Sequence, residues 1–251
     1  MIKRLFALYF LALLLPTAAA AAQNDAPLVD MVPYIATGGV LYEVQHSSGS
    51  QARHQTQYAA DRFFHTKGHE AHAEWEELWY SAETIYRGTD TSPGAEQYYT
   101  LRDGGQYGAA WAPRYWRVGD VFERNPLVTF YHKSDCSLAI TRMQRSWLRF
   151  EARHASYTFA GGITLPNVVE LAWLTSLDEP PVERYFYAAG YGLVGWQGAG
   201  IGSSGISEIH APGQRPDNSR ETIRCLDRSG ALPGLDIAPL RLWLAPGITL
   251  R

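Results

Sequence analysis

A series of short strand-like segments in the second half of the chain constrains the fold most. The segments "VVELAWLT", "VERYFYAA" and "YGLVGWQ" follow one another between residues 168 and 197, separated by the turn-forming "SLDEPP" and by Gly190. They are rich in β-branched and aromatic residues, which favour strands, and glycine and proline punctuate them. The whole chain has fifteen tyrosines and eight tryptophans, which suits the same interpretation. The series predicts an antiparallel meander.

Within this series, "ERYFYAAGYGLVGW" resembles a strand pair of secreted or lipoprotein bacterial envelope proteins. In those proteins an aromatic strand meets a Gly-x-Gly-Leu-Val strand, and "VVELAWL" fits the strand before it. The resemblance covers residues 168–197 and implies the curved antiparallel sheet of lipoprotein-carrier-like folds. It carries no catalytic residues over, and the first half of the chain is not assigned to any family.

The glycines of this stretch also match a nucleotide-binding pattern. Gly190, Gly192 and Gly195 give G-x-G-x-x-G, but "WQGAGIGSSG" follows and is unsuited to opening the helix that would hold a pyrophosphate. We therefore interpret these glycines as kinks in a β-ribbon and expect no cofactor.

The N-terminus has the layout of a secretory signal peptide. Lys3 and Arg4 precede an apolar run over residues 5–15, Pro16 and small residues up to Ala22. We expect residues 1–22 to be removed, the protein to be exported to the periplasm or the exterior, and the mature form to have no transmembrane segment. The net charge of −3 becomes more negative by two on removal of Lys3 and Arg4, which argues against nucleic acid as a partner.

The predicted fold for residues 23–251 is a single, mostly β domain. It consists of a curved antiparallel sheet, as an open half-barrel or a sandwich, with at most one covering helix, and residues 23–36 form an extended arm. Residues 137–153 fit either an amphipathic helix or a loop and a strand. The helical alternative rests on two faces at helical spacing, one of arginines and one of apolar residues: Arg142, Arg145, Arg149 and Arg153; Ile140, Met143, Trp147 and Phe150.

The chain has two cysteines, Cys136 and Cys225. In an oxidising compartment a small even number favours a disulfide bond. His132 lies close enough in sequence to Cys136 to suggest a Cys/His nucleophile as the alternative. We predict the disulfide.

The stretch "HTKGHEAHAEWEELWYS", from His65 to Ser81, holds the densest group of candidate catalytic and metal-binding residues. As a helix it would place His65, His69 and His72 on one face as metal ligands. Gly68 and the aromatic neighbours favour a hairpin with a turn at Lys67-Gly68, in which these histidines do not all meet. A hairpin would keep Glu74 and Glu76 on one face, and glycosidases use paired carboxylates at such a spacing. The candidate catalytic carboxylates are Glu74, Glu76 and Glu77.

Aromatic residues and arginine also concentrate between residues 98 and 117, in a segment we expect to form a loop. Arginine beside aromatic rings can hold a carboxylate or a sugar, although packing on a β-surface explains the same pattern. The candidate ligand-binding residues are Trp111, Arg114, Tyr115, Trp116 and Trp196.

These observations favour a non-catalytic envelope or extracellular binding protein for a small amphipathic, lipid-like molecule or a glycan. A secreted, glycosidase-like hydrolase that uses Glu74 and Glu76 is the first alternative. A metal-binding protein that uses His65, His69 and His72 is the second.

Overall fold

The computed structural model describes residues 27–37, 39–46, 49–59, 62–68, 73–91, 96–198 and 202–213. Within these ranges it does not describe the side chains of residues 51, 56–59, 64, 66–68 and 73–75. The described chain is mostly β-strand with one short helix, as predicted. The signal peptide predicted at residues 1–22 lies outside the described residues.

The elements are, in chain order, β1 Val29–Asp30, α1 Val32–Ile35, β2 Tyr42–His46, β3 Gly49–Ala59, β4 Arg62–Gly68, β5 Ala73–Tyr80, β6 Thr84–Asp90, β7 Gln97–Asp103, β8 Gln106–Tyr107, β9 Ala109–Pro113, β10 Tyr115–Trp116, β11 Val121–Arg124, β12 Leu127–His132, β13 Leu138–Met143, β14 Ser146–Thr158, β15 Thr164–Leu174, β16 Glu183–Ala188, β17 Gly192–Gly198 and β18 Gly202–Ile209. The segment around residues 98–117, predicted as a loop, thus consists largely of strands.

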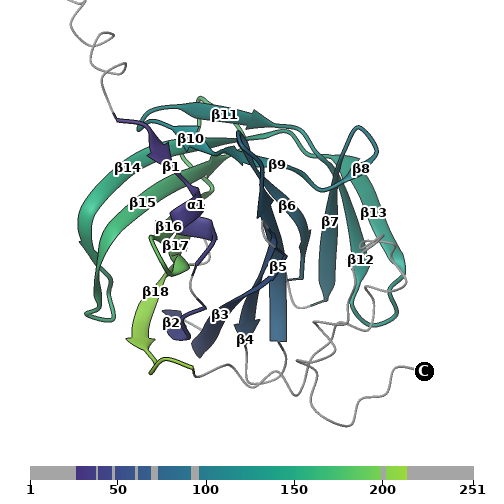
Figure 1. Cartoon of the computed structure of the whole chain (residues 1–251). Coiled ribbons are helices and arrows are strands. Elements are labelled where there is room, and N and C mark those ends of the chain that lie inside the picture. The colour runs from purple at the N-terminus through teal and green to yellow at the C-terminus, as the bar shows by residue number, and fades with distance from the viewer. Residues whose placement is uncertain are drawn as a thin grey trace, which may run out of the picture.

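All strands except β1 and β10 belong to one antiparallel sheet (Figure 1). Its order is β11-β14-β15-β16-β17-β18-β2-β3-β4-β5-β6-β7-β12-β13, with β8 paired to β7 and β9 paired to β6. β18 pairs with β2, so the last described strand lies beside the first long one. The predicted meander of residues 168–197 is confirmed as β15, β16 and β17.

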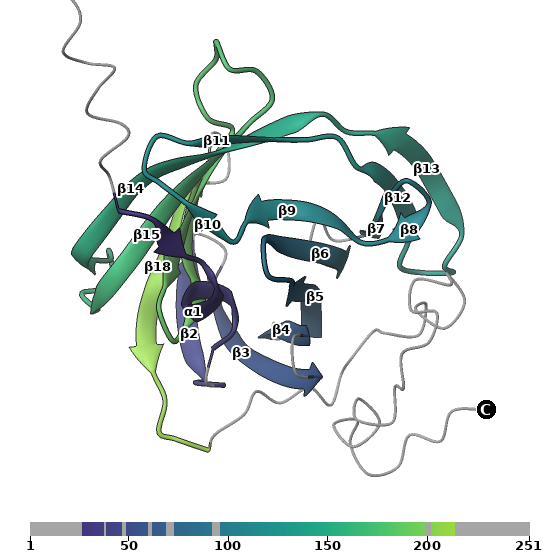
Figure 2. The same ribbon diagram turned by 45° about the horizontal axis from the view of Figure 1, so that its top comes forward.

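The sheet is strongly curved and rolls around α1, which Figures 1 and 2 show inside the curve. The extended arm predicted for residues 23–36 is therefore wrong at 32–35, where a helix begins with Pro33 in its first turn. Gln55 of β3 donates a hydrogen bond to the Ile35 carbonyl and ties the end of the helix to the sheet. We name the side of the sheet turned toward α1 the interior face and the other side the outer face.

The two edges of the sheet belong to one long hairpin. β11 continues through Asn125 and Pro126 into β12, and β13 continues through Gln144 and Arg145 into β14. Between the two halves the Gln144 N–H donates to the Pro126 carbonyl at 3.0 Å. The sheet does not close into a barrel; this hairpin spans between its ends (Figure 2).

The same hairpin decides between the two alternatives for residues 137–153. Both halves of the segment are strands, β13 and β14, and the amphipathic helix is wrong. The ladder to β11 and β12 supplies backbone hydrogen bonds to both strands, and helical spacing of the arginines does not outweigh that tertiary pairing.

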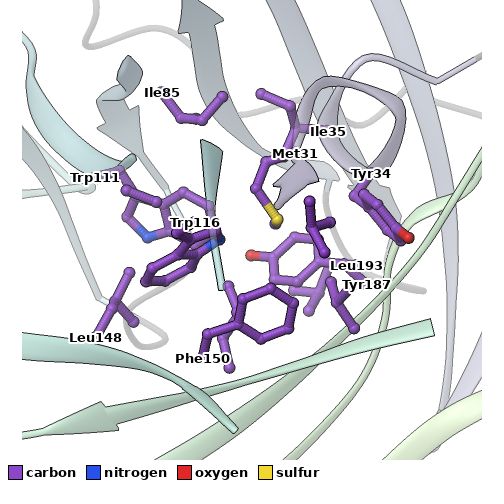
Figure 3. Packing of buried hydrophobic residues seen from close by; sticks show 14 of the residues in the cluster. Met31, Tyr34, Ile35, Ile85, Trp111, Trp116, Leu148, Phe150, Tyr187 and Leu193 are labelled. Carbon is purple, nitrogen blue, oxygen red and sulfur yellow. The ribbon is translucent and has the colours of Figure 1, made fainter. Parts of the chain in front are cut away.

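A hydrophobic cluster fills the space between α1 and the interior face (Figure 3). Met31 and Ile35 contribute from the helix region, and Trp111, Phe150 and Tyr187 contribute from the sheet. All five side chains are fully or almost fully buried. Burial of this amount of apolar and aromatic surface holds the roll in place.

The predicted hairpin within residues 65–81 is confirmed as β4 and β5, which pair from Arg62–Trp79 to Gly68–Ala73. The turn does not lie at Lys67-Gly68, since both residues belong to β4 and the connection spans residues 69–72. Cys136 lies between β12 and β13 with a positive φ of 63°. Its predicted partner, Cys225, lies outside the described residues.

Candidate functional site

The interior face carries a chain of buried charged groups centred on Arg87. The ladder between β5 and β6 is irregular, so that Glu76 pairs with Asp90 and Leu78 with Arg87. This extra residue in β6 turns Arg87 and Asp90, three positions apart, to the same face. Arg87 Nη2 lies 3.0 Å from Glu76 Oε2, and Arg87 Nη1 lies 3.9 Å from Asp90 Oδ2.

Tyr99 of β7 extends this group. Its hydroxyl donates to Asp90 Oδ2 at 3.2 Å and accepts from Arg87 Nη1 at 3.5 Å. Burial, followed by the charge of Asp90, raises the pKa of Tyr99 far above its ordinary value, so the side chain remains a neutral hydroxyl. Burial opposes the charge of Arg87, but Glu76 outweighs it and raises the pKa of the guanidinium.

His65 and Tyr42 extend the chain in the other direction. His65 is the cross-strand partner of Glu76, and its Nδ1 lies 3.5 Å from Glu76 Oε1. The Tyr42 hydroxyl donates to the Leu193 carbonyl at 2.7 Å and lies 3.2 Å from His65 Nε2. Because the hydroxyl proton points to a carbonyl, His65 Nε2 is assigned as the donor to the Tyr42 oxygen. Tyr42 thus links His65 to the backbone of β17.

Arg124, at the end of β11, differs from Arg87 because it has no acidic partner among the described residues. Its register partner is Ser146 of β14, and Arg124 Nη2 donates to Ser146 Oγ at 3.1 Å. Its Nε atom is buried without any hydrogen-bond partner in the described chain. Burial and then repulsion from Arg87 lower the pKa of Arg124 to about 10. A positive charge is therefore held in the interior without a matching negative one.

Further hydrogen-bond donors of the interior face are also unmatched within the described residues. They are Arg87 Nε, Trp116 Nε1, Trp173 Nε1 and the Tyr187 hydroxyl. A buried polar group without a partner costs about 1–3 kcal/mol, and folded proteins contain few of them. Trp116 and Tyr187 are buried in the hydrophobic cluster, whereas Trp173 is only partly buried and lies toward Arg124.

The register brings Trp173 and Arg124 to the same end of the interior face. Trp173 lies opposite Leu148 of β14, and Phe122 lies opposite Leu148 on its other side, two positions before Arg124. Tyr185 of β16 follows on the same face, and its charged form would act on Arg124. Phe122, Trp173 and Tyr185 are only partly buried, and we name these three side chains the aromatic rim around Arg124.

The predicted ligand-binding residues do not form one surface. Trp111 and Trp116 are buried in the cluster of Figure 3, where Trp111 packs on Tyr187 with ring centres 5.5 Å apart. Arg114 forms a two-point pair with Asp30, both bonds measuring 3.1 Å, and Tyr115 is exposed beside it. Trp196 of β17 is partly buried on the interior side, with Arg53 over its ring.

The candidate carboxylates and histidines are also separated. Glu76 and His65 meet on the interior face, whereas Glu77 is fully buried on the outer face, where Tyr107 donates to it and Arg62 lies 3.5 Å away. The side chain of Glu74, and His69 and His72, lie outside the described residues. Among the residues that are described, no three His, Cys, Asp or Glu side chains are grouped as a metal site.

Arg87, Arg124 and Tyr187 were not predicted from the sequence as site residues. Their meeting depends on how far the sheet rolls and on the extra residue in β6. The available signal was weak: Arg124 alternates in phase with Phe122 in "VFER", which indicates that an arginine shares the face of an apolar residue.

No helix in the described part of the chain is both long and apolar enough to cross a membrane. Comparison with family models, curated proteins and solved structures finds no match to this chain.

Proposed function

We propose that the protein is a non-catalytic binding protein for a small amphipathic molecule, which binds at the aromatic rim around Arg124. The observation that carries the proposal is the set of unmatched donors on the interior face, several of them beside aromatic side chains. Ligand sites generally combine an apolar, aromatic lining with a few convergent polar groups. An amphipathic ligand provides acceptors for the donors and an apolar part for the rings.

We further propose that the protein is exported and that Cys136 pairs with Cys225, as its leader-like N-terminus and its even cysteine number indicate.

The hydrolase alternative has less support. Glu76 is engaged by Arg87 and His65 inside a buried network, and Glu77 faces the opposite side of the sheet. Paired glycosidase carboxylates must face one sugar across a cleft. Glu76 and Glu77 do not satisfy that requirement.

The test uses molecules with one twelve-carbon chain and different head groups, below their micelle concentrations, and maltoheptaose as a free glycan. Binding raises the apparent Tm in a concentration-dependent way. We expect at least one amphiphile to raise it. The absence of any shift with every amphiphile would exclude the proposal, and a shift with maltoheptaose alone would replace it with glycan binding.

Two tryptophans of the same region give a matched pair of variants. Trp173 faces the rim, whereas Trp147, one position before the cross-strand partner of Trp173, faces the outer side. We expect Trp173→Phe to weaken binding roughly threefold to tenfold by removing one donor, and Trp147→Phe to leave it unchanged. Equal effects of both variants would count against a site at the rim.

A further inference from the structure

Arg87 has acidic partners on the interior face, whereas Arg124 has none among the described residues. Glu76 and Asp90 both lie within ion-pair distance of Arg87, at 3.0 and 3.9 Å. The largest electrostatic influences on Arg124 come from Arg87 and from the tyrosines Tyr185, Tyr99 and Tyr187, which carry no negative charge in their neutral form.

The carboxylate of Glu183 lies on the same face, but its hydrogen bond is to Tyr185. Glu183 of β16 lies opposite Trp173 and accepts a hydrogen bond from the Tyr185 hydroxyl. An isolated charge in a partly buried site costs free energy unless a partner compensates it.

The Arg124 guanidinium keeps unused donor capacity at Nε and Nη2. Nε–H has no acceptor among the described residues, and Nη2 uses one of its two hydrogens on Ser146 Oγ. The Nε and Nη2 hydrogens on one edge of a guanidinium point in parallel, and a carboxylate accepts both of them side by side.

We propose that the head group of the ligand is a monoanion of the carboxylate type, held by Nε and Nη2 of Arg124, with its apolar part against Phe122, Trp173 and Tyr185. This inference rests on the proposed function and adds the charge and shape of the head group. One unmatched arginine calls for one negative charge, and a doubly charged phosphate would exceed it.

The lowered pKa of Arg124 supports the same assignment. Burial and repulsion from Arg87 lower it to about 10, which records an unfavourable environment for the positive charge. A bound carboxylate relieves that cost, so affinity for the anion should be constant near neutral pH and decline as the pH rises above about 10.

The experiment compares dissociation constants, measured by tryptophan fluorescence and calorimetry, for dodecanoate, dodecyl phosphate and dodecyl maltoside. We expect dodecanoate to bind the full-length protein more tightly than either of the others. Arg124→Gln should lose about tenfold or more of the affinity for dodecanoate and little for the maltoside. Arg124→Lys, which keeps the charge but lacks the parallel donors, should recover part of the loss.

Arg145→Gln serves as the control, because Arg145 lies on the same hairpin but pairs with Glu123 in solvent. The Arg145 variant should bind all three molecules as the parent does. If dodecyl maltoside binds as tightly as dodecanoate and Arg124→Gln changes neither, the head-group inference is wrong while the proposed function stands. Tighter binding of dodecyl phosphate would overturn the single charge, and no binding of any molecule would overturn both proposals.

Discussion

Glu76 Oε2 and Arg87 Nη2 form an ion pair of 3.0 Å between adjacent strands, with side chains that are 2% and 14% exposed. Removal of one partner from such a pair leaves the other charge buried and incompletely compensated, at a cost of about 3–5 kcal/mol. We expect Glu76→Gln to lower the free energy of unfolding by that amount, measured by urea denaturation.

The double variant Glu76→Gln/Arg87→Met tests whether the loss of stability comes from the charge left unpaired. It removes both charges and should be more stable than Glu76→Gln alone. Glu123→Gln, in an ion pair that is mostly exposed, should change the unfolding midpoint little. If Glu76→Gln behaves like Glu123→Gln, the interior pair does not contribute as described.

The Asp30–Arg114 pair, which joins β1 to the residue between β9 and β10, should make stability depend on pH in the acid range. Partial burial raises the pKa of Asp30, but the hydrogen bonds and charge of Arg114 and the Val32 N–H outweigh it and lower the pKa overall. A carboxyl whose pKa is lowered on folding stabilises the protein above its unfolded value of about 3.9. That contribution is lost as the pH falls through the folded value.

The difference in urea midpoint between the parent and Asp30→Asn should therefore be constant above about pH 5 and disappear toward about pH 2. A difference that persists at the lowest pH would show that the charge of Asp30 is not its source.

Two glycines have nearly the same φ, so that the cost of steric crowding can be measured separately from that of backbone strain. Gly108 has φ +83°, and a Cβ there would lie 2.0 Å from Trp79 Cη2, whereas Gly105 has φ +87° and open space around it. Alanine at either position incurs backbone strain of about 1 kcal/mol. Gly108→Ala should cost about 1–3 kcal/mol more, because the Trp79 ring must move.

Urea denaturation of the two variants gives this difference directly. Trp79 is stacked between Tyr86 and Tyr107, so its displacement should also change the near-ultraviolet circular dichroism. Equal stability of Gly108→Ala and Gly105→Ala would show that Trp79 moves aside without cost.

The proposed Cys136–Cys225 bond would enclose a loop of about 90 residues and stabilise the protein by roughly 4–5 kcal/mol. We expect the denatured, unreduced protein to give no reaction with a thiol reagent and the reduced protein to give two equivalents. Cys136→Ser should lower the unfolding midpoint to that of the reduced parent. Reaction of two thiols without prior reduction would show that Cys136 and Cys225 are not disulfide-bonded.

Arg124→Met should increase the stability of the ligand-free protein. The substitution removes a partly buried charge without an acidic partner and keeps a side chain of similar length. The free energy of unfolding should rise by about 1 kcal/mol or more. A loss of stability would mean that the Arg124–Ser146 hydrogen bond outweighs the cost of the charge.

Local sequence patterns predicted the strands correctly where strands that pair also follow one another in the sequence. The hairpin of β4 and β5 and the meander of β15–β17 follow from alternation and from turn residues. The same rules failed for β13 and β14, where arginines at helical spacing mimic an amphipathic helix. They also missed α1, which is too short to show a periodic pattern and is held by its packing inside the roll.

The site was harder to predict than the fold. His65 and Glu76 were both candidates, and their cross-strand pairing follows from the hairpin register. Trp111 and Trp116 looked like a binding surface because aromatic residues serve cores and surfaces equally well. Arg124 meets Arg87 and Tyr99 only through the roll of the whole sheet, which no local stretch of sequence specifies.

The ladder between β18 and β2 determines when the sheet can be completed during synthesis of the chain. Most of the sheet forms from hairpins, but this pairing joins residues as distant as Tyr42 and Ile209, which lie 209 − 42 = 167 positions apart. β2 therefore remains an open strand edge until nearly the entire described chain has emerged. The roll therefore cannot be completed from the N-terminal half of the chain alone, and the free side of β2 is paired only when β18 arrives.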